Sequence, residues 1–325
     1  MNRPGDAANH NPTVLITGAS SGIGLETARL LSQEGFRVIA GYRRPEAAPM
    51  LSQTLGPAAV PLRLDVTDES SIRLAAQQVA GIATSGVAGL VNNAGVALAG
   101  PLEGLSTSQL TNQFHTNVLG PILVSQALLP LIRRGNGRIV HVGSAAGSLA
   151  LPFLGTYAAS KSALDLIADS MRRELQLVYP SKKESLPRSS FGQIGRFFGY
   201  RPDRSPLSEG GSQTIPVIMV RPGRMATGIF DRSEREAIAG LESMEASIQQ
   251  RYRPYLLRLQ TLLHRYEKHR GNPKRVAKVI HRALTVKRPR SRYQIGLDAV
   301  AVHQLTKWLP DSILDALIAR SLRPR

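Results

Sequence analysis

The stretch Thr17-Gly18-Ala19-Ser20-Ser21-Gly22-Ile23-Gly24 follows the apolar run Val14 to Ile16 and opens a segment with helical spacing. This order predicts a strand, a tight turn and a helix. Glycines let a ligand approach the turn without an intervening Cβ, and the free N–H groups at a helix N-terminus bind anions. The stretch therefore indicates a pyrophosphate site for a dinucleotide, with a purely structural loop as the alternative. Its candidate cofactor-binding residues are Thr17, Gly18, Ser20, Ser21, Gly22, Ile23 and Gly24.

Short apolar runs alternate with segments of helix length, which is typical of a parallel sheet with crossover helices. We expect an α/β fold of the Rossmann type, a doubly wound parallel sheet flanked by helices, with a C-terminal helical extension. Local signals also predict a helix N-cap at Thr67 and a capping box at Ser106 and Gln109. Strands are expected within residues 14–16, 38–40, 60–64, 90–91, 139–142 and 217–220, with a further one at 293–295.

The chain has 325 residues, 42% of them apolar, which is enough for one sizeable core. We therefore expect one domain over residues 13–325, after a disordered lead at residues 1–12. Residues 180–214 are rich in proline, glycine and serine, which predicts a surface insertion. Residues 228–325 have mostly helical spacing and are expected to form a lid over a substrate pocket and the C-terminal region.

Two arginines follow the second predicted strand, at the edge where parallel strands bind nucleotides. A site for NAD(H) usually has a carboxylate here, whereas the 2′-phosphate of NADP(H) requires a cation. Arg43 and Arg44 therefore favour NADP(H), with NAD(H) as the alternative cofactor. The same arginines would also suit a solvated turn.

Polar and small residues follow the third and fourth predicted strands. Asp65, before Val66, could bind an adenine amino group or simply begin a helix. Asn93 stands in a run of small residues at the end of a central strand, which suits both close cofactor approach and stabilisation of the sheet. The candidate cofactor-binding residues of these two segments are Asp65, Val66, Asn93, Ala94 and Gly95.

Tyr157 and Lys161 are four residues apart, so a helix would place the phenol and the ammonium on one face. A phenol pKa of about 10 is too high for efficient proton exchange at neutral pH, and a nearby cation is expected to lower it. Ser144 follows a predicted strand and could hold a substrate oxygen, although a serine beside a glycine is often a turn residue. These residues predict acid/base chemistry at a carbonyl or an alcohol.

Together these motifs resemble the short-chain dehydrogenase/reductase family over residues 13–228. The resemblance implies hydride transfer between a nicotinamide and the substrate carbon, with Tyr157 exchanging the proton and Lys161 also binding the nicotinamide ribose. It makes Asn117 a proton-relay residue. It also places a further segment beside the nicotinamide carboxamide, namely Pro222, Gly223 and Thr227. The candidate catalytic residues are then Asn117, Ser144, Tyr157 and Lys161.

Later segments are similar to the branch of this family that acts on retinoids, hydroxysteroids and 3-hydroxybutyrate. The similarity rests on residues 35–38, 282–285 and 292–298. It implies an apolar alcohol or carbonyl substrate, without choosing between retinoid, steroid and lipid. It also implies a homodimer or tetramer formed through the helices that follow Ser106 and Thr156.

The net charge of +18 is concentrated late in the chain, because residues 251–292 hold 14 Lys and Arg and one acid, Glu267. A solvated helix face is the first explanation, contact with an anionic membrane the second, and nucleic-acid binding the third. The chain has no cysteine, and its histidines have no metal-ligand spacing, so no metal site is expected. The protein is expected to be cytoplasmic, or peripheral to a membrane.

An enzyme is therefore expected, a short-chain alcohol dehydrogenase or carbonyl reductase. The alternative is a catalytically silent protein that binds the cofactor and acts as a regulator. The enzyme is favoured because the sequence contains all four candidate catalytic residues, Asn117, Ser144, Tyr157 and Lys161.

Overall fold

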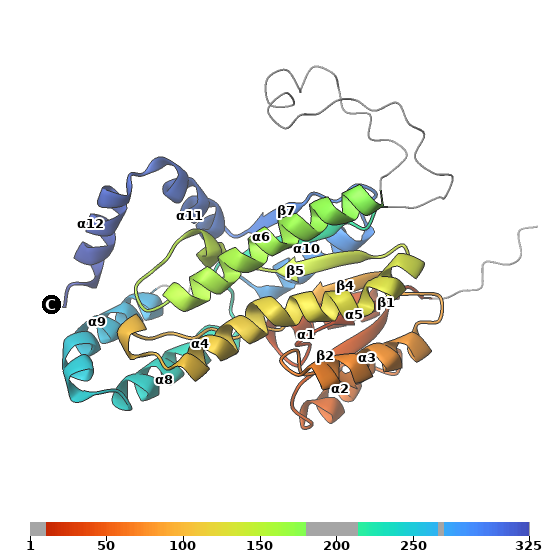
Figure 1. Ribbon diagram of the computed structural model, residues 1–325, viewed down its shortest axis with the longest axis horizontal. Helices are drawn as coiled ribbons and strands as arrows, with labels where there is room; N and C mark the ends of the chain where they lie inside the picture. Colours follow the sequence, from red (N-terminus) through yellow and green to blue (C-terminus); the bar gives the residue numbers. More distant parts are fainter. Residues whose placement is uncertain (1–10, 180–213, 266–269, 325) are drawn as a thin grey trace, which may run out of the picture.

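The computed structural model describes residues 11–179, 214–265 and 270–324 (Figure 1). One parallel sheet crosses it, with its seven strands in the order β3-β2-β1-β4-β5-β6-β7. This order confirms the doubly wound Rossmann-type fold, and all seven expected strands form. They are β1 (Thr13–Ile16), β2 (Arg37–Tyr42), β3 (Val60–Arg63), β4 (Gly89–Asn92), β5 (Arg138–Val142), β6 (Val217–Pro222) and β7 (Arg292–Ile295).

Helices connect the strands and cover both faces of the sheet. Those of the first half are α1 (Gly22–Gln33), α2 (Ala47–Leu55), α3 (Glu69–Ile82), α4 (Thr107–Phe114), α5 (Gly120–Arg134) and α6 (Gly155–Val178). Short turns of helix are η1 (Leu102–Gly104), η2 (His115–Leu119) and η3 (Ala145–Ser148). Those of the second half are α8 (Gly228–Glu242), α9 (Ala246–Arg265), α10 (Pro273–Thr285), α11 (Leu297–Trp308) and α12 (Asp311–Leu322).

The strands read as continuous apolar runs because the sheet is buried on both faces. Successive side chains of β1 alternate between two cores: Val14 and Ile16 pack on the side of α1, α2 and α10, and Leu15 packs on the side of α3, α5 and α6. The part of the chain after residue 270 therefore completes the fold, since α10 buries Ile280 against the first core and β7 is the outermost strand.

One continuous helix, Thr107–Arg134, comprises α4, the π-helical turn η2 and α5. In the described chain it is the one helix with the length and apolarity of a membrane span, with a mean hydropathy of 1.3. It packs as a core helix instead, with 56% of that apolar window buried. Its Val124, Leu128 and Ile132 lie in the second core.

The predicted capping box at the start of α4 is confirmed, because Ser106 Oγ accepts from Gln109 N and Gln109 Oε1 accepts from Ser106 N. The predicted N-cap at Thr67 is wrong. Asp68 caps α3 by accepting from Ser70 N, and the Thr67 hydroxyl donates instead to Asp65. A carboxylate one residue nearer the helix satisfies the free N–H groups in place of the threonine hydroxyl.

The predicted insertion, residues 180–214, and the predicted lead, residues 1–12, lie almost wholly outside the described residues. Within the described part, the basic segment 251–292 divides between two places. Helix α9 packs beside α8, and α10 packs on α1. Figure 1 shows α8, α9, α11 and α12 gathered at one end of the molecule, beyond the sheet.

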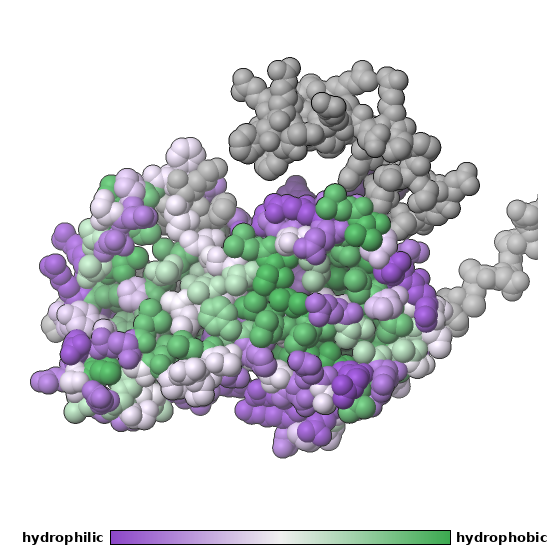
Figure 2. All heavy atoms as spheres, viewed as in Figure 1, coloured by the Kyte–Doolittle hydropathy of each residue, from purple (hydrophilic) through white to green (hydrophobic). Residues whose placement is uncertain are grey.

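Apolar residues are exposed on α6 and on the long helix, as Figure 2 shows over α5 and α6. Leu119 and Leu166 are among them, with 43% and 69% of their surface exposed. The expected homo-oligomer contact through these helices stays a prediction.

Candidate active site

The glycine-rich turn is held in place by the end of β4. Thr17 Oγ1 accepts hydrogen bonds from the backbone N–H groups of Asn93 and Ala94, both at 3.0 Å. In return, Asn93 Nδ2 donates to the carbonyl oxygens of Thr17 and Gly18, both at 3.0 Å. The side chains of Thr17 and Asn93 therefore fix the shape of the turn, which is the stabilising role expected of Asn93.

Glycines in and around this turn keep a ligand-sized space open. Gly22 has φ +55°, and a Cβ there would lie 3.1 Å from Thr227 Cγ2. A Cβ at Gly95 would lie 3.2 Å from Asn117 Oδ1 and 3.5 Å from Lys161 Nζ. Side chains at these two positions would fill the cleft, so the geometry fits an extended ligand such as a dinucleotide.

A cleft of about 300 Å³ runs along the carboxyl edge of the sheet and brings most predicted site residues together. The predicted residues that line it are Gly18, Ser20, Ser21, Gly22, Ile23, Arg43, Asp65, Val66, Asn93, Ala94, Gly95, Ser144, Tyr157, Lys161, Pro222, Gly223 and Thr227. Four predicted residues are absent from this lining: Thr17, Gly24, Arg44 and Asn117. Arg44 is exposed, and Gly24 packs so closely that a Cβ would lie 2.3 Å from Gly18 O.

Tyr157 and Lys161 lie on the first turns of α6, and each is only 4% exposed. Lys161 Nζ donates to Val142 O at 3.0 Å, which ties the catalytic helix to the end of β5. Ser144, from the turn that follows β5, lines the same cleft as Tyr157 and Lys161. The three predicted groups therefore meet at one point.

The pKa of Tyr157 lies above its ordinary value, because burial disfavours the phenolate more than the hydrogen bond from Ser144 favours it. The net lowering of this pKa that we expected is therefore wrong, because burial outweighs the favourable contacts of the phenolate. Burial also lowers the pKa of Lys161 to about 8, although the nearby Asp165 opposes the shift. Tyr157 thus holds its proton at neutral pH and is ready to donate it.

Asn117 lies in the π-helical turn η2 and is fully buried. Its Oδ1 accepts from Val96 N at 2.9 Å, and its Nδ2 donates to Val96 O at 2.9 Å and to Ser160 Oγ at 3.0 Å. The side chain therefore holds the loop after β4 against α6. π-Turns are often found at functional sites, which is in keeping with the relay role. That role stays a prediction for Asn117.

Sequence reasoning missed several residues of the site, four of them at the start of α8. Phe230 and Arg232 line the cleft, and the Phe230 ring meets the Tyr157 ring edge to face with centroids 6.0 Å apart. The sequence shows only an amphipathic helix here, and nothing local to the helix says which face meets the cleft. The other missed lining residues are Leu64, Thr67, Val96, Thr116, Val142, Gly143, Met225, Gly228 and Ile229.

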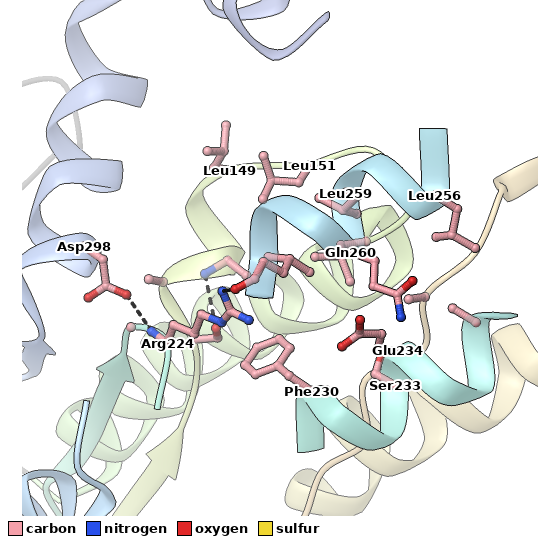
Figure 3. Close-up of a pocket in the computed structure, with 18 of the residues that line it drawn as sticks. Leu149, Leu151, Arg224, Phe230, Ser233, Glu234, Leu256, Leu259, Gln260 and Asp298 are labelled. Carbon is pink, nitrogen blue, oxygen red and sulfur yellow. Dashed lines mark hydrogen bonds between the residues drawn. The ribbon is translucent and has the colours of Figure 1, made fainter. Parts of the chain in front are cut away.

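A second cavity, of about 180 Å³, adjoins the cleft and shares Ser144, Gly223 and Phe230 with it (Figure 3). Its walls are mostly leucine and alanine. They come from the segment before α6 and from α8 and α9, and include Leu149, Leu151, Leu154, Ala237, Leu256, Leu259 and Leu263. An apolar molecule in this cavity would reach Ser144 and Tyr157 at one end.

Comparison with known proteins agrees with this geometry. The family described as short chain dehydrogenase matches residues 12–178, about half of the chain. The chain belongs to the short-chain dehydrogenase family. It is therefore an oxidoreductase of that family, as the motifs led us to expect.

Similar proteins extend the match beyond residue 178. Retinol dehydrogenase 5 of Homo sapiens is 31% identical over 324 residues, which cover 95% of this short-chain dehydrogenase and 88% of the relative. The 3-ketodihydrosphingosine reductase of Bacteroides thetaiotaomicron is 28% identical over 93% of this chain and 94% of its own length. The uncharacterized oxidoreductase YbbO of Escherichia coli (strain K12) is 40% identical over 50% of this chain, and the match spans only 60% of YbbO.

Solved structures share the fold of this short-chain dehydrogenase. A short chain dehydrogenase from Burkholderia cenocepacia J2315 in complex with NADP superimposes with a TM-score of 0.63 at 20% identity, over 97% of this chain and 99% of the other. A short chain dehydrogenase/reductase from Burkholderia phymatum in complex with NAD superimposes with a TM-score of 0.68 at 20% identity, over 98% of both chains.

Proposed function

We propose that this protein is an NADP(H)-dependent oxidoreductase that interconverts an apolar alcohol and the corresponding ketone or aldehyde. The observation that carries the proposal is the boundary between the cleft and the apolar cavity. Ser144 and Phe230 line both of them, and Tyr157 lines the cleft beside this boundary. The names of the retinol dehydrogenases and of the 3-ketodihydrosphingosine reductase support an apolar substrate. Loss of NADPH absorbance in the presence of an apolar ketone tests the proposal.

In this proposal the bound cofactor supplies the hydride that reduces the carbonyl carbon. Ser144 donates to the carbonyl oxygen and orients it. Tyr157, which holds its proton because it is buried, gives that proton to the same oxygen. Lys161, one helical turn away, stabilises the phenolate that results. In alcohol oxidation the same groups act in the reverse direction.

The cleft contains two cations suited to a phosphate, Arg43 after β2 and Arg232 on α8. A cation at the ribose end of the cleft discriminates NADP(H) from NAD(H) by a charge-assisted hydrogen bond to the 2′-phosphate. This supports NADP(H) as the preferred cofactor. Arg44, exposed and outside the cleft lining, provides a matched comparison on the same loop.

Replacing Arg43 with alanine is expected to weaken NADPH binding by about 10- to 100-fold, the effect of losing a hydrogen bond to a charged group. NADH, which has no 2′-phosphate, should bind Arg43→Ala as it binds the parent protein. Fluorescence titration of both cofactors measures this, with Arg44→Ala as the control. An equal loss of affinity for NADH and NADPH would argue that Arg43 does not bind the 2′-phosphate.

Carbonyl reduction is expected to slow as the pH rises through about 8, the pKa of Lys161. Below that pH Lys161 carries its charge and stabilises the phenolate. Above it the neutral amine does not, so kcat/KM should fall by about tenfold per pH unit. The pH profile of kcat/KM tests this, and Lys278→Met, an exposed lysine on α10, should keep the profile. A pH profile of kcat/KM that stays flat through pH 8 would show that carbonyl reduction does not require the positive charge of Lys161.

The second candidate, binding of nucleic acid or of a membrane through the basic segment, has less support. Its described residues are divided between α9, α10 and the start of β7, and α9 and α10 pack in different places. Several of its arginines already bond to other parts of this chain: Arg251 pairs with Glu103, Arg292 pairs with Asp169, and Arg258 donates to Ser321 O. We therefore favour the enzyme.

A further inference from the structure

Two carboxylates line the apolar cavity beside the catalytic residues, those of Glu234 and Asp298, and Asp298 Oδ2 already accepts from Arg224 N at 2.6 Å. Glu234 comes from α8, and its side chain is 16% exposed. Across the cavity α9 presents Gln260, and Figure 3 shows the carboxylate of Glu234 and the amide of Gln260 turned toward each other. The remaining walls are largely leucine and alanine. Arg224 also lines the cavity, but its side chain donates to Leu263 O and its backbone N–H donates to Asp298. Glu234 and Gln260 therefore form one polar end of the cavity.

The carboxylate is incompletely satisfied. Glu234 Oε1 has no contact with solvent and accepts no hydrogen bond. The contact of this oxygen is with His264 Nε2, also from α9, at 3.2 Å, and His264 is half exposed. A carboxylate can only accept hydrogen bonds and offers about four acceptor positions, so the contact with His264 leaves it incompletely satisfied. A donor on the bound ligand would complete it.

The spacing on α8 locates this carboxylate relative to the reaction. Phe230 lies against Tyr157, with ring centroids 6.0 Å apart. Glu234 is four residues further along the helix, which is a rise of about 6 Å. Consider a ligand whose carbonyl contacts Ser144 and Tyr157. The atoms of that ligand that reach Glu234 would then lie on the order of 10 Å from its carbonyl.

We propose that Glu234, with Gln260 beside it, binds a hydroxyl or ammonium group of the substrate on the order of 10 Å from the reacting carbonyl. The substrate class is then an apolar ketone or alcohol with a second, hydrogen-bond-donating group at its far end. This inference rests on the proposed function and narrows it. Glu234 acts in substrate selection and takes no part in hydride or proton transfer.

The test compares three ketones of equal chain length in the NADPH-dependent reaction. One is an unsubstituted ten-carbon methyl ketone, the second has a terminal hydroxyl, and the third a terminal ammonium. The parent protein is expected to show a kcat/KM about 10- to 100-fold higher for the two substituted ketones, mainly through a lower KM. The gain corresponds to one hydrogen bond to a charged acceptor.

Two substitutions at Glu234 separate charge from hydrogen bonding. Glu234→Leu should remove the preference for both substituted ketones. Glu234→Gln is closely isosteric and should keep the preference for the hydroxyl ketone and lose that for the ammonium ketone. Glu236→Gln, an exposed glutamate on the same helix that does not line the cavity, should keep the preferences of the parent protein.

The outcomes distinguish this inference from the proposed function. Turnover of all three ketones at equal kcat/KM, or a preference that survives in Glu234→Leu, would overturn the role of Glu234 and leave the oxidoreductase reaction intact. Calorimetric binding to the NADPH complex provides a second readout. Tighter binding of the substituted ketones that depends on Glu234, with no turnover, would support the binding site and reject the proposed reaction. Equal binding of all three ketones, without turnover, would reject both.

Discussion

Replacing Tyr157 with phenylalanine is expected to lower kcat for ketone reduction by about 10²- to 10⁴-fold, the usual contribution of a positioned general acid. The phenol is the group that meets Ser144 at the junction of the cleft and the apolar cavity. Phenylalanine keeps the ring that packs against Phe230, so the site should keep its shape. NADPH should therefore bind the variant as it binds the parent protein, and steady-state kinetics with cofactor titration measure both quantities.

Tyr255→Phe is the matched control, because Tyr255 is a partly exposed tyrosine on α9 outside both spaces. It should leave kcat and NADPH binding unchanged. If Tyr157→Phe retained kcat within a few-fold of the parent value, another group would have to supply the proton. If the variant lost NADPH binding as well, the loss of activity would report on the cleft rather than on proton transfer.

Arg221→Met is expected to destabilise the fold by about 3–5 kcal/mol. Arg221 on β6 meets Asp165 on α6 through two contacts, Nε to Oδ1 at 3.0 Å and Nη2 to Oδ2 at 2.8 Å. Both side chains are almost fully buried, and burial already raises the pKa of Asp165. Removing the arginine leaves that carboxyl buried without its partner, one helical turn below Lys161. Urea unfolding at neutral pH measures the free energy of unfolding.

A double-mutant cycle isolates this ion pair. Asp165→Leu combined with Arg221→Met removes both charges and should recover much of the loss, since a buried pair replaced by apolar side chains is often nearly neutral. Arg29→Met removes a partly exposed ion pair with Glu26 on α1 and should cost less than about 1 kcal/mol. Equal costs at Arg221 and Arg29 would show that the buried pair does not secure α6 to the sheet.

The parts of the site carried by short motifs were predictable from the sequence. The glycine-rich turn, Ser144 and the Tyr157–Lys161 pair each depend on strand–turn–helix order or on a spacing of four, and the sheet brings them to one edge. Arg43 was correctly placed in the cleft, but its neighbour Arg44 points elsewhere. Neighbouring residues in a turn face different directions, and the sequence does not record which.

Properties that depend on tertiary packing were not predictable. The pKa of Tyr157 is set by how deeply α6 is buried, and burial outweighs the favourable contact with Ser144. Glu234 and Gln260 meet only because α8 and α9 pack against each other across the cavity, and the sequence shows these helices only as amphipathic segments. The sequence likewise does not show that the basic helices α9 and α10 pack in different places.

The most direct test of the proposed reaction is transfer of deuterium from NADPH labelled at C4 of the nicotinamide to an apolar ketone, followed by mass spectrometry of the product. We predict that the parent protein forms an alcohol with deuterium on the former carbonyl carbon, and that Tyr157→Phe binds the same cofactor but forms almost none. A parent protein that binds NADPH and the ketone but transfers no deuterium would contradict the proposed reaction.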